Sequence, residues 1–203
     1  MIRKNASKRV RLRKPTGPQR LALRITLRHI EPLIWREISV PDSYSLLQLH
    51  RCIQLVFGWL DYHLFEFQIG SRRFEAANPD AEGEDAASTL LRELQLIAGS
   101  SFLYVYDMGD YWEHDIAVRK VTDAPPGDEL DPLGYLVDGE RAAPPEDVGG
   151  PPGYEHAMAA FVCQADGDDE DLVVWLGSDF DPELFDRRAG NHALMLATAW
   201  SVI

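Results

Sequence analysis

The stretch richest in side chains that can do chemistry is YDMGDYWEH at 106–114, which lies between two apolar runs. It holds three carboxylates and one histidine. Asp107 and Asp110 flank a two-residue turn, so their oxygens can converge on a hard cation such as Mg²⁺ or Mn²⁺. His114 is the third member of this candidate metal set, which Glu146 and Asp147, or His50 and His63, can complete. The structural alternative is that aspartates flank turns because they accept hydrogen bonds from backbone amides, with Gly109 supplying a positive φ.

A second candidate is PPEDVGG at 144–150, where an acidic pair stands between prolines and glycines. Such a loop is pre-organised, as a binding loop should be. Glu146 and Asp147 are therefore candidate catalytic carboxylates, with Glu146 as a general base. In the structural alternative, the pair caps the following helix or forms ion pairs with Arg36 or Arg141, which would fix the long loop against the sheet.

Five further residues are candidates because they can join or support these two stretches. They are His50, His63, Trp35, Arg36 and Trp112. The two histidines can complete a metal set, and Trp112 projects on the same strand face as His114. Trp35 and Arg36 are expected in a buried network in which the guanidinium satisfies a carboxylate. The sequence requires no cofactor, and a divalent metal is the one it can accommodate.

The sequence lacks the motifs that several common enzyme classes require. The chain has no YxRxS string of a serine resolvase, and none of its four lysines follows an acid at the two-residue offset of restriction-type nucleases. It also has no GxxxxGK phosphate loop, no GxSxG nucleophile elbow and no HExxH zinc helix. Each of these chemistries depends on its spacing, so the carboxylate and histidine residues remain as the candidates.

The net charge of −13 is unevenly distributed. Residues 1–28 hold ten of the twenty Lys and Arg residues and no acid, whereas the remainder carries thirty-three acids. A basic, flexible arm is predicted at 1–19, before an acidic body at 20–203. Neutralised phosphates release counterions, so the arm is a candidate nucleic-acid contact. Its candidate residues are Lys4, Lys8, Arg9, Arg11, Arg13 and Lys14. The alternative is a solvated tail.

The bulk composition sets the expected compartment and partners. Cys52 and Cys163 have no metal-type spacing and are expected to be reduced thiols. No apolar run approaches the length of about 18 residues that a membrane helix needs. We therefore expect a cytoplasmic protein without a membrane partner. The acidic body is expected to meet a protein partner.

Apolar periodicity predicts an α+β class, a compact single domain of antiparallel hairpins with helices mainly C-terminal. The strands of three hairpins are predicted at 21–29 and 33–40, 63–69 and 72–75, and 102–107 and 112–121. A helix is predicted from the capping-box pair Ser45 and Gln48 to Gly58. Further helices are predicted at 153–163 and within 182–200, the latter with Asp181 as N-cap. The stretches 76–88, 125–153 and 165–171 are predicted as loops, and 90–97 is ambiguous.

Several segments resemble one known family. They are IEPLIWREISVP (30–41), LLQLHRCIQLVFGWLDYHLFEF (46–67), FLYVYDMGDYWEHDI (102–116), DGERAAPPEDVGGPPGY (138–154) and, more weakly, FDPELFDRRAGNHAL (180–194). Together they look like the plasmid Ri-type ORF-three-like family, whose members are often labelled transposon-passenger TnpR proteins. The resemblance covers about residues 20–195 and excludes the basic arm.

This resemblance implies a compact α+β domain associated with plasmids and mobile elements, without a settled activity. Many members carry cysteines near the GER and PPED segments, where this chain has Leu136, Ala143 and Val148. A thiolate zinc site cannot be built from those positions. Two functions follow from the sequence: a non-catalytic accessory or interaction module, or a metal-dependent hydrolase or ligand-binding enzyme that uses YDMGDYWEH and PPED.

Overall fold

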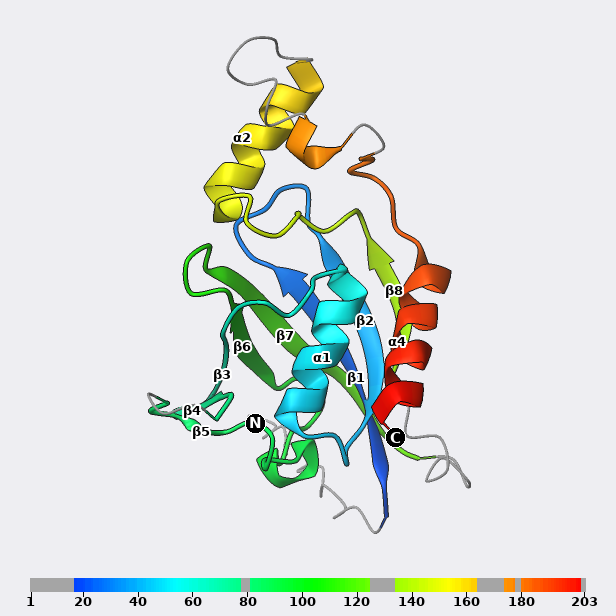
Figure 1. The fold of residues 1–203 in the computed structure, drawn as a ribbon. Helices are drawn as coiled ribbons and strands as arrows, with labels where there is room; N and C mark the ends of the chain where they lie inside the picture. Colours follow the sequence, from blue (N-terminus) through cyan, green and yellow to red (C-terminus); the bar gives the residue numbers. More distant parts are fainter. Residues whose placement is uncertain (1–16, 78–80, 125–133, 164–173, 178–179, 202–203) are drawn as a thin grey trace, which may run out of the picture.

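The computed structural model describes residues 17–77, 81–124, 134–163, 174–177 and 180–201 (Figure 1). Eight strands form one sheet in the order β5-β4-β3-β6-β7-β1-β2-β8. The strands are β1 (Gln19–Leu27), β2 (Trp35–Pro41), β3 (Phe65–Ile69), β4 (Arg72–Glu75), β5 (Glu84–Asp85), β6 (Ser101–Tyr106), β7 (Trp112–Asp123) and β8 (Tyr135–Glu140). The helices are α1 (Leu46–Phe57), α2 (Gly150–Cys163) and α4 (Arg187–Ser201), with a 3-10 helix at Leu91–Leu94.

The three predicted hairpins are confirmed as β1–β2, β3–β4 and β6–β7, each antiparallel. The long β1 and β7 pair at the centre of the sheet, and only the β4–β5 pair among the described strands is parallel. Alternation along β1 buries Leu23, Ile25 and Leu27 completely, because successive side chains point to opposite faces. The α+β class is confirmed.

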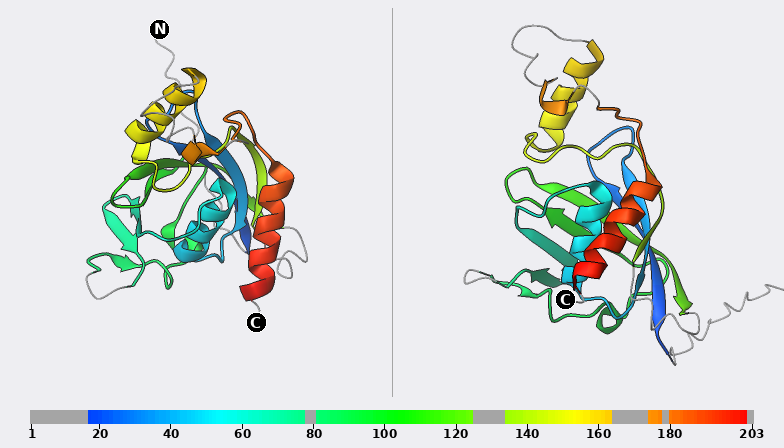
Figure 2. Two further views of the ribbon diagram at one scale, coloured as in Figure 1. Left: turned by 45° about the horizontal axis from the view of Figure 1, so that its top comes forward. Right: turned by 45° about the vertical axis from the view of Figure 1, so that its right-hand side comes forward.

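Helix α1 lies against the concave face of the sheet, which curves around it (Figure 2). The predicted capping box is present: the Ser45 hydroxyl accepts from the Gln48 amide, and the Gln48 side chain accepts from the Ser45 amide. Gly58 ends the helix in the left-handed conformation. Both helix ends are thereby satisfied locally, and the loop that begins at Trp59 leaves the helix with a defined direction.

Helix α4 covers the edge strand β8. The Asn191 side chain accepts from the Leu136 amide at 2.9 Å and donates to the Leu136 carbonyl at 2.9 Å, so an amide side chain pairs with the open sheet edge. A Cβ on Gly190 would lie 2.5 Å from Leu136 Cδ2, so a larger residue there would require the Leu136 side chain to move. The predicted N-cap Asp181 is wrong. The helix begins after Asp186, whose carboxylate accepts from the Arg188 and Ala189 amides.

Two other predictions need correction. The predicted loop at 125–153 contains β8, whose short run of apolar residues was hidden among prolines and glycines. The predicted acidic loop at 76–88 contains the short β5. The ambiguous 90–97 segment holds the 3-10 helix, and the helix predicted at 153–163 begins three residues earlier, at Gly150. Residues 1–16 of the basic arm and the loop at 165–171 lie outside the described residues.

None of the helices in the described part of the chain combines the length and the apolar character needed to cross a membrane.

Candidate cation site where three loops meet

Three segments that are far apart in the sequence meet beside the turn of the β6–β7 hairpin. His63 comes from the loop after α1, Asp107 from the turn after β6, and Asp147 from the PPED loop before α2. His63 Nε2 lies 3.0 Å from Asp147 Oδ1 and 3.6 Å from Asp107 Oδ2. One ligand atom from each of the three residues lies within 4.8 Å of the others. One imidazole nitrogen and two carboxylate oxygens therefore surround one point.

The position of Asp107 is fixed by its own turn. Its amide donates to the Leu64 carbonyl at 2.9 Å, and its Oδ1 accepts from the Gly109 amide at 2.8 Å. Its φ of 59° lies in the left-handed region, which aspartate tolerates better than most residues. Because Oδ1 is used within the turn, Oδ2 is the oxygen that faces His63. The aspartate is therefore held by the turn and presents one oxygen to the site.

The PPED loop is tied down by residues on both sides of it. The Trp59 indole donates to the Pro144 carbonyl at 2.9 Å. Glu146 accepts from the Tyr106 hydroxyl at 2.5 Å through one oxygen and from the Leu60 amide at 3.1 Å through the other. Both oxygens of the predicted general base are thus occupied by protein donors. Glu146 anchors the loop that presents Asp147, and it forms none of the predicted alternatives with Arg36, Arg141 or the helix end.

Asp110 has a related anchoring contact. Its Oδ2 accepts from the Gly149 amide at 3.1 Å, which ties the hairpin turn to the start of α2. A Cβ on Gly150 would lie 2.3 Å from the Asp110 carbonyl oxygen, so the two segments are in backbone contact. Asp110 belongs to the wall of the site, and it does not join the three-residue cluster.

The ligand set suits a divalent metal. His63 Nε2 is buried and has no hydrogen-bond partner among the described residues, although both carboxylates are near it. The exposed side-chain fractions are 29% for His63, 10% for Asp107 and 58% for Asp147, so the cluster opens to solvent on the Asp147 side. Two carboxylates and a neutral imidazole match the charge of a divalent ion, and these donor types suit first-row metals.

A network of hydrogen bonds joins α1 to Tyr104 and to the loop that carries His63. His50 Nε2 lies 2.6 Å from Asp61 Oδ1, and its Nδ1 lies 2.8 Å from the Tyr104 hydroxyl. Gln54 donates to the same hydroxyl at 3.0 Å and accepts from the Asp61 amide at 3.2 Å. Burial raises the pKa of Tyr104 well above its usual range. His50, although predicted as a possible ligand, is fully buried and fixes the loop that carries His63.

His114 lies in the aromatic core, away from Asp107. Its ring packs edge-on against Phe57 and Trp59, and it is completely buried. Its Nδ1 lies 3.1 Å from the Trp112 carbonyl, so it donates there. Burial lowers its pKa to about 3, so the ring is neutral near pH 7. Trp112 is 1% exposed and, as expected, shares the His114 face. The structure thus keeps Asp107 of the predicted metal set in the site and replaces Asp110 and His114 with His63 and Asp147.

Trp35 and Arg36 lie on β2, two strands from β7 and beside the edge strand β8. Arg36 donates to the carbonyls of Val56, Trp35 and Glu140, so the prediction that its guanidinium satisfies a carboxylate is wrong. Burial lowers its pKa to about 10. The Trp35 indole donates to a Glu140 carboxylate oxygen at 2.8 Å. Both residues join β2 to β8.

Sequence reasoning missed Asp61 and Tyr106 as organising residues. Tyr106 donates to Glu146 and accepts from the Tyr62 amide at 3.1 Å, so one hydroxyl joins two of the three loops. The spacing of Asp61 and His63 in WLDYH was the available signal.

Comparisons with known proteins agree with this fold. The model of the family described as plasmid pRiA4b ORF-3-like protein matches residues 19–189. The chain belongs to this family. It is 35% identical over 186 residues to the uncharacterized protein y4hQ of Sinorhizobium fredii, covering 88% of this chain and 93% of that protein. The crystal structure of the protein of unknown function MM3350 from Methanosarcina mazei superposes with a TM-score of 0.75 at 34% identity, covering 85% of this chain and 98% of that one.

His63, Asp107 and Asp147 all lie within residues 19–189, the part of the chain that the family model matches.

Proposed function

We propose that this protein binds a divalent first-row metal cation through His63, Asp107 and Asp147, and that metal-assisted hydrolysis is the chemistry this site supports. The observation that carries the proposal is the buried His63 Nε2, which lies 3.0 Å and 3.6 Å from two carboxylate oxygens without a hydrogen bond to a described residue. An imidazole nitrogen placed beside two carboxylate oxygens is an arrangement that a shared cation stabilises.

Three protein ligands leave coordination positions open, as in catalytic metal sites. Those positions would face the solvent side of Asp147, which is 58% exposed. A metal there can polarise a carbonyl or phosphoryl oxygen and lower the pKa of a bound water. Glu146 supports this chemistry by holding the loop, because its oxygens already accept two hydrogen bonds.

The proposal is tested by titrating the full-length protein with Mn²⁺ and following the loss of the free-ion signal by electron paramagnetic resonance. His63→Ala and Asp147→Asn are each expected to weaken binding at least about tenfold, since each removes a ligand. The matched controls are His192→Ala and Asp123→Asn, which change exposed residues of the same types on α4 and β7. Circular dichroism melts check that all four variants fold.

Equal Mn²⁺ affinity in the wild type, His63→Ala and Asp147→Asn would disprove the site. If the site binds, hydrolysis of p-nitrophenyl acetate and p-nitrophenyl phosphate with and without Mn²⁺ tests the chemistry. Metal-dependent turnover that Asp147→Asn removes is the expected result. Tight binding without turnover on either substrate class would favour the second candidate.

The second candidate is a non-catalytic accessory module that binds a protein partner. The observation that favours it is the exposure of Leu60, Tyr62 and Leu64, at 62%, 72% and 58%, on the loop that carries His63. Exposed apolar residues grouped in this way often mark interaction sites. A partner from the natural host that is retained by the wild type and lost with Leu60→Ser plus Leu64→Ser would support this function. Equal retention by both proteins would contradict it.

We also propose that the basic arm binds nucleic acid. Its charge is concentrated at Lys4, Lys8, Arg9, Arg11, Arg13 and Lys14, outside the described residues. Deletion of residues 1–19 is expected to abolish a salt-dependent mobility shift of duplex DNA, because the acidic body repels phosphates. Binding that survives the deletion would refute a role for the arm.

A further inference from the structure

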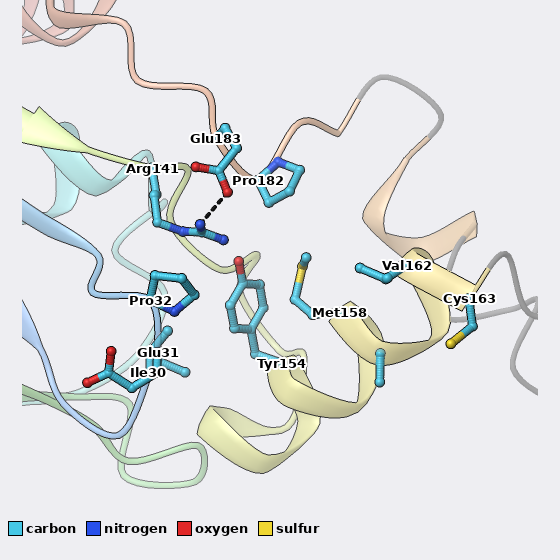
Figure 3. A pocket seen from close by; sticks show the side chains of 11 residues that line it. Ile30, Glu31, Pro32, Arg141, Tyr154, Met158, Val162, Cys163, Pro182 and Glu183 are labelled. Carbon is cyan, nitrogen blue, oxygen red and sulfur yellow. Dashed lines mark hydrogen bonds and ion pairs between the residues drawn. The ribbon is translucent and has the colours of Figure 1, made fainter.

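A pocket of about 510 Å³ lies beside α2, outside the cation site (Figure 3). This volume is in the range of small-molecule sites. Its walls come from the β1–β2 turn, the end of β8, helix α2 and the segment before α4. Its lining includes Pro32, Arg141, Tyr154, Met158, Val162 and Pro182.

One face of α2 forms the largest wall. Tyr154, Met158 and Val162 recur every four residues, so they lie along one side of the helix. Val162 is 74% exposed, although its neighbours on this face are largely apolar. Pro32 and Pro182 lie across from this face in Figure 3. The walls are thus mainly apolar and come from segments that the sheet and helix hold in place.

Two polar atoms in the pocket lack partners. Arg141 Nε and Tyr154 Oη are both buried, and neither has a hydrogen-bond partner among the residues the structure describes. Tyr154 as a whole is only 3% exposed. Figure 3 shows its hydroxyl directed toward the guanidinium of Arg141. Burial raises the pKa of Tyr154, so the hydroxyl keeps its proton. Arg141 Nε can only donate. The Tyr154 hydroxyl can accept from the guanidinium that it faces and still has its own proton to donate. Neither the Nε proton nor this hydroxyl proton has an acceptor among the described residues.

The charge balance decides which acceptor fits. The Arg141 guanidinium is already paired with the Glu183 carboxylate, and Glu31 adds a second acid to the lining. In Figure 3 the Glu31 carboxylate points away from the Tyr154 hydroxyl. An anionic ligand would have to compete with Glu183 and would meet a negative lining. A neutral acceptor satisfies the two donors without that cost.

We propose that this pocket binds a small, uncharged, largely apolar molecule whose carbonyl oxygen accepts from Tyr154 Oη and Arg141 Nε. The apolar body of the ligand lies against Met158, Val162 and Pro182. This inference does not rest on the cation site, since the two sites share no lining residue.

Cys163 provides the measurement. It lines the pocket and its thiol is exposed, whereas Cys52 is buried and burial raises its pKa to about 12. A disulfide reagent should therefore react with Cys163 alone in the native protein. Three probes of similar size are compared: benzamide, benzoate and benzylamine, which are neutral, anionic and cationic at neutral pH. Each is added at about 10 mM, suited to the weak binding of such small ligands.

Benzamide is expected to slow the reaction of Cys163, with benzoate and benzylamine giving less protection. Tyr154→Phe should weaken benzamide protection about fivefold, the effect of losing one neutral hydrogen bond. Tyr135→Phe makes the same change at an exposed position on β8 and should leave protection unchanged. Protection by benzoate equal to or above that of benzamide, no protection by any probe, or full protection in Tyr154→Phe would each overturn the proposal.

Discussion

Two regions of this molecule treat their buried polar groups in opposite ways. Near the cation site, the hydroxyls of Tyr104 and Tyr106 each have two partners, which lie on α1 for Tyr104 and on two different loops for Tyr106. In the pocket beside α2, Tyr154 Oη and Arg141 Nε have none among the described residues. A buried donor without an acceptor costs free energy, whereas a paired one holds segments together. The paired groups of the first region therefore stabilise the fold, and the buried donors of the second region remain able to donate to a ligand.

The largest effect is expected from Tyr104→Phe. This change leaves His50 Nδ1 and Gln54 Nε2 without their partner in a site that is 0% exposed at Tyr104. We expect the free energy of unfolding to fall by about 3 kcal/mol, since two buried groups lose a bond. Urea denaturation at neutral pH measures the change. A loss as small as that of the exposed control Tyr135→Phe would show that the paired region is not what stabilises this end of the sheet.

Tyr106→Phe should cost somewhat less, about 2 kcal/mol, because it breaks one bond to a carboxylate and one to the Tyr62 amide. It also frees Glu146, so the PPED loop should present Asp147 less well. We therefore expect weaker Mn²⁺ binding together with lower stability. If the variant is destabilised but its Mn²⁺ affinity is unchanged, the Tyr106–Glu146 hydrogen bond is not needed for cation binding.

His114 Nε2 is the exception within the paired region, since it has no partner among the described residues. The folded pKa of about 3 lies below the ordinary 6.5, so the unfolded chain binds more protons between these values. Stability must then rise with pH in this window and fall as the solution is acidified. The contribution lost between about pH 7 and pH 5 is about 2 kcal/mol.

The pH dependence of the wild type is compared with that of His114→Phe, which keeps an aromatic ring in the core. The unfolding free energy of the variant should fall less on acidification. Parallel curves for the two proteins would mean that His114 is not the group that takes up the proton.

The smallest effect is expected from Tyr154→Phe in the absence of ligand. The change removes a hydroxyl that has no hydrogen bond to a described residue, so the free energy of unfolding should stay within about 1 kcal/mol of the wild type or increase. Thermal melts of both proteins measure this. A loss as large as that of Tyr106→Phe would show that the hydroxyl is satisfied in solution, and the contrast between the two regions would disappear.

Local patterns predicted the elements that depend on near neighbours in the chain. The capping box at Ser45 and the stop at Gly58 bound α1 as expected, because both act within one helical turn. Period-two alternation predicted three hairpins for the same reason. β8 was missed because the prolines and glycines around it outweigh its short apolar run, and it is held by β2 and α4. We predicted Asp181 as the cap of α4, and the structure has Asp186 in that role.

The candidate site shows the same division between what local sequence and what long-range packing determine. By itself, the sequence determined which residues were chemically competent, since His63, Asp107 and Asp147 were all candidates before the fold was known. It grouped Asp107 with Asp110 and His114 because those residues are adjacent in the chain. Only the tertiary structure decided the grouping: strand alternation sends His114 into the aromatic core, and the Tyr106–Glu146 bond brings a loop forty residues away to the turn. Such long-range pairings depend on the summed packing of the whole sheet, which no local pattern records.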